Sequence, residues 1–282
     1  MHVRPASGPS SASRRRARRL AGAVAAAAVA LAAAPAAAQF APAGPAVGES
    51  YHVEILGGFW NPAPTAIVSS EQLGIPGTDI DFVNDLGMTR RQFRDLRIVL
   101  RPALKHKFRI QYTPVRYTAE ATVTKDIVFN AIRYRVGLPV SSDFSWTVWR
   151  LGYEYDVYAG PRGFAGLILE AKYTTVSVTL DSPPIGTEFA RARAPIPAIG
   201  GIGRVYVIPN VAAGFELTGF KLPNIDEKYK ATYVDWDLYG LVNFSEHFGA
   251  QIGYRSLDAN YQIELDTGDL KLKGPYFAGI VR

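Results

Sequence analysis

The sequence contains no cysteine among its 282 residues, so no disulfide framework can hold the fold together. An exported chain without disulfides needs another source of stability. A closed β-barrel is one such source, because every strand of a ring is hydrogen-bonded along both edges. Histidine is also scarce, with four residues in the chain, which leaves few candidates for a general base.

Long apolar runs are absent, apart from one segment near the N-terminus. An arginine-rich stretch, residues 14–19, precedes an alanine-rich apolar stretch, residues 20–34, and an A-x-A-like site ends at Ala38. This three-part pattern predicts a signal peptide over residues 1–38, cleaved near Ala38 and Gln39. A single transmembrane anchor is disfavoured, because the run falls short of the roughly 20 residues that a span needs.

The mature chain lacks an excess of either charge. The full sequence holds 31 Lys and Arg against 25 Asp and Glu, a net charge of +6. Residues 1–38 contain six arginines and no acid, so removing them leaves 25 basic residues against 25 acidic ones. The basic character belongs to the leader, and no nucleic-acid partner is predicted.

What the chain has in abundance is alternation of apolar and polar residues, most clearly over residues 230–244. Val234, Trp236 and Leu238 alternate there with Asp235 and Asp237. A period of two places the two sets on opposite faces of a strand. A long strand that is apolar on one face and charged on the other is typical of a bilayer-spanning barrel.

The same pattern recurs along the chain and predicts ten strands. Residues 39–50 read as a periplasmic lead-in and 51–282 as the barrel domain, with long loops at 61–89 and 124–143. A small hairpin through Val128 and Tyr134 is expected in the second loop. The predicted strands cover residues 51–60, 91–101, 107–123, 147–157, 164–180, 189–208, 211–222, 230–244, 248–265 and 270–282.

In three of these strands the apolar set changes phase, at Pro114 and near Thr175 and Ser256. At Pro114 a β-bulge is the simplest interpretation, since a bulge shifts the alternation by one residue and proline cannot donate to the ladder. Val115 and Tyr117 are then expected on the apolar outer face.

Most connections alternate between short turns and longer polar loops, as in bacterial outer-membrane barrels. The predicted fold class is therefore all-β, an up-and-down antiparallel transmembrane β-barrel of about ten strands, with eight or twelve as alternatives. Residues 49–282 resemble the small outer-membrane barrels of diderm bacteria, of OmpA/OmpW-like architecture, although no diagnostic signature is present. The last strand has Gly274 and Phe277 where that class has its assembly signal but ends in Arg282, without a terminal aromatic residue.

The resemblance implies location in the bacterial outer membrane. It also implies contact with outer-membrane lipid and lipopolysaccharide, and with the barrel-assembly machinery during insertion. The oligomeric state stays open.

The inner face is predicted to carry charges of both signs, which must pair because a lone buried charge costs several kcal/mol. An interior filled by ion pairs and a thin water-filled pore are both compatible with this set. The predicted lumen-lining charged residues are Glu54, Asp95, Arg97, Arg101, Arg109, Arg150, Glu154, Asp156, Glu170, Lys172, Arg191, Arg193, Glu216, Asp235, Asp237, Arg255 and Lys271. The predicted lipid-facing aromatic residues are Tyr112, Trp149, Tyr153, Tyr155, Trp236 and Tyr276.

The expected function is that of an integral outer-membrane barrel with a structural or narrow-pore role. One alternative is a barrel enzyme, a protease or a lipid A-modifying hydrolase, which would need a base near the outer rim. After cleavage only His52, His106 and His247 remain, all expected away from the outer loops. No catalytic residue, metal or cofactor is predicted. Another alternative is a soluble lipocalin-like barrel that binds an apolar ligand and has the two faces exchanged.

Overall fold

The computed structural model describes residues 45–70, 77–225, 229–263 and 266–282. The predicted signal peptide and the first residues of the lead-in, 39–44, lie outside this part of the chain. Among the described residues, no helix is both long and apolar enough to cross a membrane.

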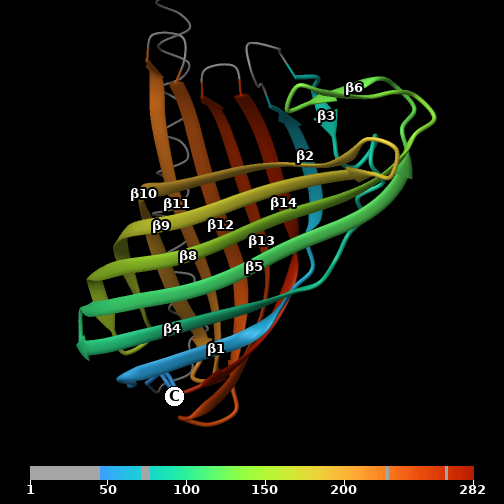
Figure 1. The fold of residues 1–282 in the computed structure, drawn as a ribbon. Helices are drawn as coiled ribbons and strands as arrows, with labels where there is room; N and C mark the ends of the chain where they lie inside the picture. The colour runs from blue at the N-terminus through green and yellow to red at the C-terminus, as the bar shows by residue number, and fades with distance from the viewer. Residues whose placement is uncertain (1–44, 71–76, 226–228, 264–265) are drawn as a thin grey trace, which may run out of the picture. The chain divides into compact units, whose positions relative to one another are not determined.

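Ten antiparallel strands close into a ring, which confirms the predicted fold class and strand number (Figure 1). The ring runs β1, β4, β5 and then β8 to β14, and β14 pairs back with β1 through residues 276–281 and 55–60. The ring strands are β1 (Val53–Trp60), β4 (Phe93–Ala103), β5 (His106–Thr122), β8 (Pro139–Gly160), β9 (Gly163–Ser182), β10 (Gly186–Ile208), β11 (Val211–Ile225), β12 (Tyr229–Asn243), β13 (Phe248–Ile263) and β14 (Asp266–Val281).

Four short strands of the described residues lie in the predicted loops. β2 (Ala63–Ser69) pairs with β14 through residues 267–273, so β1 and β2 follow one another along the same edge of β14. β3 (Ile80–Asp81) pairs with β2. The hairpin expected in the second loop is present as β6 (Ile127–Phe129) and β7 (Ile132–Tyr134).

The connections define two ends of the barrel. The turn end carries the short connections 104–105, 161–162, 209–210 and 244–247, together with the C-terminus. The loop end carries the connections from β1 to β4 and from β5 to β8, which contain the four short strands. These two names are used below.

Each ring strand contributes to an apolar belt on the outer surface of the turn-end half. Exposed side chains of Val, Leu, Ile and aromatic residues form it, and the lumen behind them is charged. The belt consists of Val53, Ile55, Phe59, Leu96, Leu100, Phe108, Ile110, Trp149, Leu151, Tyr155, Val157, Leu167, Leu169, Tyr173, Ile199, Val205, Val207, Phe215, Leu217, Val234, Leu238, Val242, Ile252, Tyr254, Phe277 and Val281.

Beyond the belt, toward the loop end, the polarity of the two faces inverts without any change of register. In β8 the outer face passes from Trp149 to Ser145 and Asp143, while the inner face passes from Arg150 to Trp146 and Phe144. The wall there is polar outside and apolar inside, like that of a water-soluble barrel.

This inversion shows that the predicted bulge at Pro114 is wrong. β5 pairs with β8 in continuous register through Pro114, and Val115 and Tyr117 lie inside, 1% exposed. The pairings of β9 and β13 are likewise continuous past Thr175 and Ser256. The apolar set changes phase because the surroundings of each face change, not because the strand gains a residue.

The apolar interior of the loop-end half is completed by the connection before β4. Ile80, Phe82 and Leu86 are fully buried, and the Phe82 ring packs edge-on against Phe144 with ring centroids 5.7 Å apart. Hydrogen bonds from Phe82 N to Ala66 O and from Thr78 N to Val128 O fix this segment to β2 and β6. The folded-in segment, residues 78–88, therefore occupies the lumen at the loop end.

The described part of the lead-in closes against the turn end. Ala46 N donates to Pro161 O and Val47 N to Pro209 O, so this segment binds two of the turns. Glu49 reaches Arg204 and Arg101, at 3.3 and 3.9 Å. Residues 45–50 therefore pack against the turn end of the barrel.

Candidate functional site: the charged lumen

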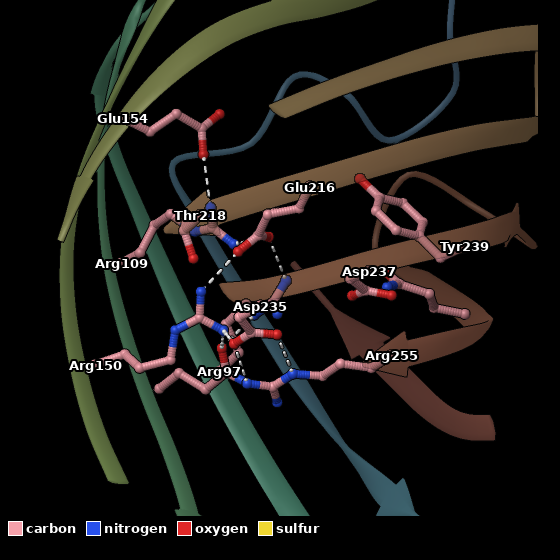
Figure 2. A network of polar contacts seen from close by, with 12 residues as sticks. Arg97, Arg109, Arg150, Glu154, Glu216, Thr218, Asp235, Asp237, Tyr239 and Arg255 are labelled. Atoms are coloured by element: carbon pink, nitrogen blue, oxygen red, sulfur yellow. Dashed lines mark hydrogen bonds and ion pairs between the residues drawn. The ribbon is translucent and has the colours of Figure 1, made fainter. Parts of the chain in front are cut away.

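The centre of the charged lumen is Glu216, 2% exposed, which β11 places on the inner face. Its carboxylate faces three arginines from three other strands, as Figure 2 shows. Arg109 Nη2 lies 2.5 Å, Arg150 Nη2 2.8 Å and Arg97 Nη1 3.5 Å from its oxygens. One buried carboxylate thus compensates charge from β4, β5 and β8 at once, which ties opposite walls of the barrel together.

A second cluster forms around Asp235 on β12. Arg255 Nη2 lies 2.8 Å from its Oδ2 and Arg150 Nη1 lies 3.3 Å from the same atom. Lys172, fully buried, lies 3.3 Å from Glu170 and 3.7 Å from Asp235. Because Arg150 contacts both Glu216 and Asp235, the two clusters form one network across the lumen (Figure 2).

Toward the turn end the network continues through Lys107. Its Nζ lies 2.7 Å from Glu154 Oε1 and 2.9 Å from Asp156 Oδ2. The same nitrogen sits 3.3 Å from the centroid of the Phe164 ring, a cation–π contact. Lys107 is 1% exposed, so its charge is held entirely by these neighbours.

The C-terminal residue also lies in the network. Arg282 Nε lies 2.6 Å from Glu54 Oε2, and Arg282 Nη1 donates to Asn243 Oδ1 at 2.8 Å. Both members of the Arg282–Glu54 pair have side chains 2% exposed. The last residue therefore forms a buried ion pair with β1, the strand next to β14 in the ring.

Most of the predicted lumen residues lie on the inner face of the barrel. They comprise Glu54, Asp95, Arg97, Arg101, Arg109, Arg150, Glu154, Asp156, Glu170, Lys172, Glu216, Asp235, Asp237 and Arg255; all are buried except Asp95, which is partly buried. Tyr112, Trp149, Tyr153, Tyr155 and Trp236 lie on the outer face, as expected.

Four residues lie on the opposite face from the one predicted. Arg191 and Arg193 are exposed on the outer face of β10, and Lys271 lies on the outer face of β14, near Asp258 and Asp269. Tyr276 faces the lumen, where its hydroxyl donates to Asp237 Oδ2 at 2.9 Å. In β10 and β14 the prediction assigned the outer face from the apolar residues of the segment beyond the belt, and in that segment the apolar residues face inward.

Some lumen residues were missed by the sequence reasoning. Lys107 and Arg204 are buried and charged, and Gln111 accepts hydrogen bonds from Arg97 and Arg150. The alternation of β5 already places Lys107 and Gln111 beside Arg109. Arg204 lies on the opposite face of β10 from Arg193. Because Arg193 was predicted to face the lumen, Arg204 was not.

The lumen is filled at the level of the network. The void between Trp60, Arg97 and Arg255 is about 20 Å³, room for about one water molecule. Trp60 and Arg255 stack in a cation–π contact, with 5.0 Å between guanidinium carbon and ring centroid.

The three histidines of the described part lie near the turn end. His52 Nδ1 lies 3.3 Å from Arg101 O, His106 Nδ1 lies 2.7 Å from the Tyr153 hydroxyl, and His247 lies in the connection from β12 to β13. Within the described residues, no three His, Asp or Glu side chains gather in a way that could hold a metal ion.

The acidic residues of the folded-in segment serve a local role. Asp81 accepts hydrogen bonds from Val83 N at 2.9 Å, Asn84 N at 3.0 Å and Asn84 Nδ2 at 2.6 Å. Partial burial works to raise the pKa of Asp81, but these bonds, with the nearby Lys125, outweigh it and hold that pKa below its ordinary value. Asp85 pairs with Lys125 at 2.8 Å.

No protein-family model and no curated protein sequence matches the chain. Among solved structures, it resembles the outer membrane protease OmpT from Escherichia coli, with a TM-score of 0.55 at 9% identity over 81% of this chain and 95% of that one. Ail, the attachment invasion locus protein of Yersinia pestis, gives a TM-score of 0.35 at 7% identity over 80% of this chain and 97% of that one. The likeness to OmpT is one of fold.

Proposed function

We propose that this protein is an integral outer-membrane barrel with a closed lumen and a structural, non-catalytic role. The observation that carries the proposal is the inversion of polarity at the edge of the belt. A wall that is apolar outside and charged inside suits lipid, and a wall that is polar outside and apolar inside suits water. The belt is the membrane-spanning part, and the loop-end half projects from the membrane.

The closed state follows from how the charges are compensated. Glu216, Asp235 and Lys107 each contact two or more opposite charges inside the belt. Arginine–carboxylate pairs that cross the lumen fill the space through which solutes would pass. The folded-in segment packs into part of the loop end above them. These features favour a structural barrel over the narrow-pore alternative.

The same placement gives the orientation of the barrel and its partners. The turn end faces the periplasm, since short turns lie there in this class of barrel. The partners are outer-membrane lipid, lipopolysaccharide and the barrel-assembly machinery. A catalytic role is disfavoured because the three histidines of the described part lie at the turn end, away from substrates outside the cell.

The test combines two measurements. In the outer-membrane fraction we expect a band whose mobility on an SDS gel changes on boiling, because a closed barrel resists SDS. In planar bilayers we expect no steady conductance, with an open porin as the positive control. Reproducible single-channel steps from the wild-type protein would replace the closed barrel with the narrow pore. A protein found soluble after lysis would contradict membrane insertion.

A further inference from the structure

The ring of strands opens at the loop end between β10 and β11. The two strands pair from Ile199–Gly219 down to Ile208–Val211. Beyond Ile199, β10 pairs with β9 alone, and beyond Gly219, β11 pairs with β12 alone. In Figure 1, β11 rises steeply at the left, whereas the loop-end half of β10 runs across to the right beside β9. The barrel wall therefore has a gap on this side.

The branch point is set by a glycine. A Cβ atom at Gly200, on the inner face of β10, would overlap the carbonyl oxygen of Leu217 on β11. Only glycine lets the two backbones approach this closely before they part.

A cavity of about 360 Å³ lies behind the gap, within the range of about 300–1,000 Å³ typical of small-molecule sites. Its walls are mainly apolar and include Trp146, Val176, Phe220 and Leu222. A cavity at the turn end, near His52 and Arg101, has a more polar wall.

The cavity opens through the gap. Ala192 and Ala194 lie on the inner face of β10 and line the cavity, yet both are exposed. On the other strands at this level, inner-face residues are buried, such as Trp146 and Tyr233, or half-buried, such as Val176 and Phe220. The exposure of the two alanines marks the place where the wall is missing.

Four cations surround the gap on the outer surface. Arg191 and Arg193 are exposed on β10, Lys221 on β11 and Lys230 on β12. Pro195 pairs with the belt residue Tyr173, so Arg193 lies about 7 Å beyond the belt edge, one two-residue repeat along the strand. The gap thus begins at the edge of the belt and rises between positive charges.

We propose that this cavity binds one acyl chain, which enters between β10 and β11 while the cations hold its anionic headgroup. An apolar cavity takes hydrocarbon because apolar surface leaves water, and the exposed cations complement a phosphate or carboxylate. The site lies outside the charged lumen, and a lipid-binding role is additional to the proposed structural role. The inference rests on the proposed function only for the direction from which the acyl chain enters.

Tryptophan quenching tests this directly, since bromine atoms on an acyl chain quench only nearby indoles. One variant retains Trp146 alone, through Trp60→Phe, Trp149→Phe and Trp236→Phe. Its matched control retains Trp60 alone, which is buried in the lumen but outside the cavity. In vesicles containing phosphatidylglycerol with brominated chains, we expect Trp146 to be quenched at least twofold more than Trp60.

Two pairs of variants test the entrance and the charges in the Trp146-only background. Ala194→Phe should abolish the quenching, whereas Ala171→Phe, on the outer face of β9, should leave it unchanged. Arg191→Glu with Arg193→Glu should lower it to the level seen with brominated phosphatidylcholine. Arg94→Glu, exposed on β4 away from the gap, should not. A boiled and unboiled gel confirms that each variant is folded.

A brominated fatty acid added in detergent separates the two sources of such a chain and does not require membrane insertion. Quenching by the fatty acid alone assigns the site to free acids, and quenching by the lipid as well assigns it to bilayer lipids. Trp146 quenched no more than Trp60 by either probe, in a folded protein, would overturn the acyl-chain site while leaving the closed barrel intact.

Discussion

Single residues at the centre of the charged lumen are coupled because they share their partners. Arg150 contacts Glu170, Glu216 and Asp235, so no pair in the centre of the barrel is isolated. Removing one partner of a buried ion pair is costly, since the remaining charge is left without compensation in a poorly solvated site. Exposed pairs behave differently, because water screens both charges.

Replacing Glu216 with leucine therefore tests the network at its centre. Three arginines lose their shared carboxylate, and we expect the free energy of unfolding to fall by about 3–5 kcal/mol, measured by urea titration in detergent micelles. The matched control is Asp143→Leu, which breaks an ion pair with Arg116. The side chains of Asp143 and Arg116 are 28% and 70% exposed. We expect that control to cost about 1 kcal/mol or less. Similar losses in the two variants would contradict a network held by buried charge.

Residue positions could be predicted wherever a strand segment lies inside the belt. The faces of Arg97, Arg150 and Asp235 followed from alternation alone, because the belt segments keep their apolar residues on one face and their charged residues on the other. The faces of Arg193 and Tyr276 did not follow, because the apolar residues of the same strands beyond the belt lie on the inner face. Nothing in the alternation itself marks where the surroundings change from apolar to aqueous.

At the scale of elements, the same ambiguity produced the incorrect bulge at Pro114. A one-residue insertion and an exchange of surroundings give the same change of phase in a sequence. The strand register distinguishes them, and it is continuous in β5, β9 and β13. β2 was missed for a different reason, because Asn61 and Pro62 interrupt the first strand and resemble the start of a loop.

The folded-in segment gives a prediction on pH. Because the pKa of Asp81 in the folded protein lies below 3.8, its ordinary value, its hydrogen bonds stabilise the segment fully above that value. That stabilisation is lost as the pH falls through the lowered pKa. Hydrogen exchange of the amides of residues 78–88, corrected for intrinsic rates, should become faster relative to the β12 amides between pH 5 and 2.5.

Replacing the Asp81 carboxylate tests whether this residue causes the pH dependence. Asp81→Asn should make the exchange of residues 78–88 independent of pH over the same interval, whereas Asp79→Asn, exposed just before β3, should retain the wild-type dependence. A pH dependence that persists unchanged in Asp81→Asn would assign the effect to another group.

For the molecule as a whole, ring closure and strand number could be predicted because ten amphipathic segments and mostly alternating turn lengths permit few other arrangements. The contents of the lumen could not. Whether a loop folds into a barrel depends on contacts such as Phe82 with Phe144, which join residues 62 positions apart. The gap between β10 and β11 likewise arises from how two neighbouring strands part at Gly200.

The placement of the whole barrel in a membrane can be tested along one strand. The chain has no native cysteine, so a single introduced cysteine reports its own surroundings. Ser145 and Leu151 lie on the same outer face of β8, Ser145 beyond the belt and Leu151 within it. In intact cells we expect a membrane-impermeant maleimide to label Ser145→Cys, because the loop end faces outward, and to leave Leu151→Cys unlabelled.

Solubilisation in detergent followed by unfolding should make both cysteines react. Equal labelling of the two in intact cells would mean that the belt is exposed to water, and labelling of Ser145→Cys only after the outer membrane is opened would reverse the proposed orientation while keeping the belt in lipid.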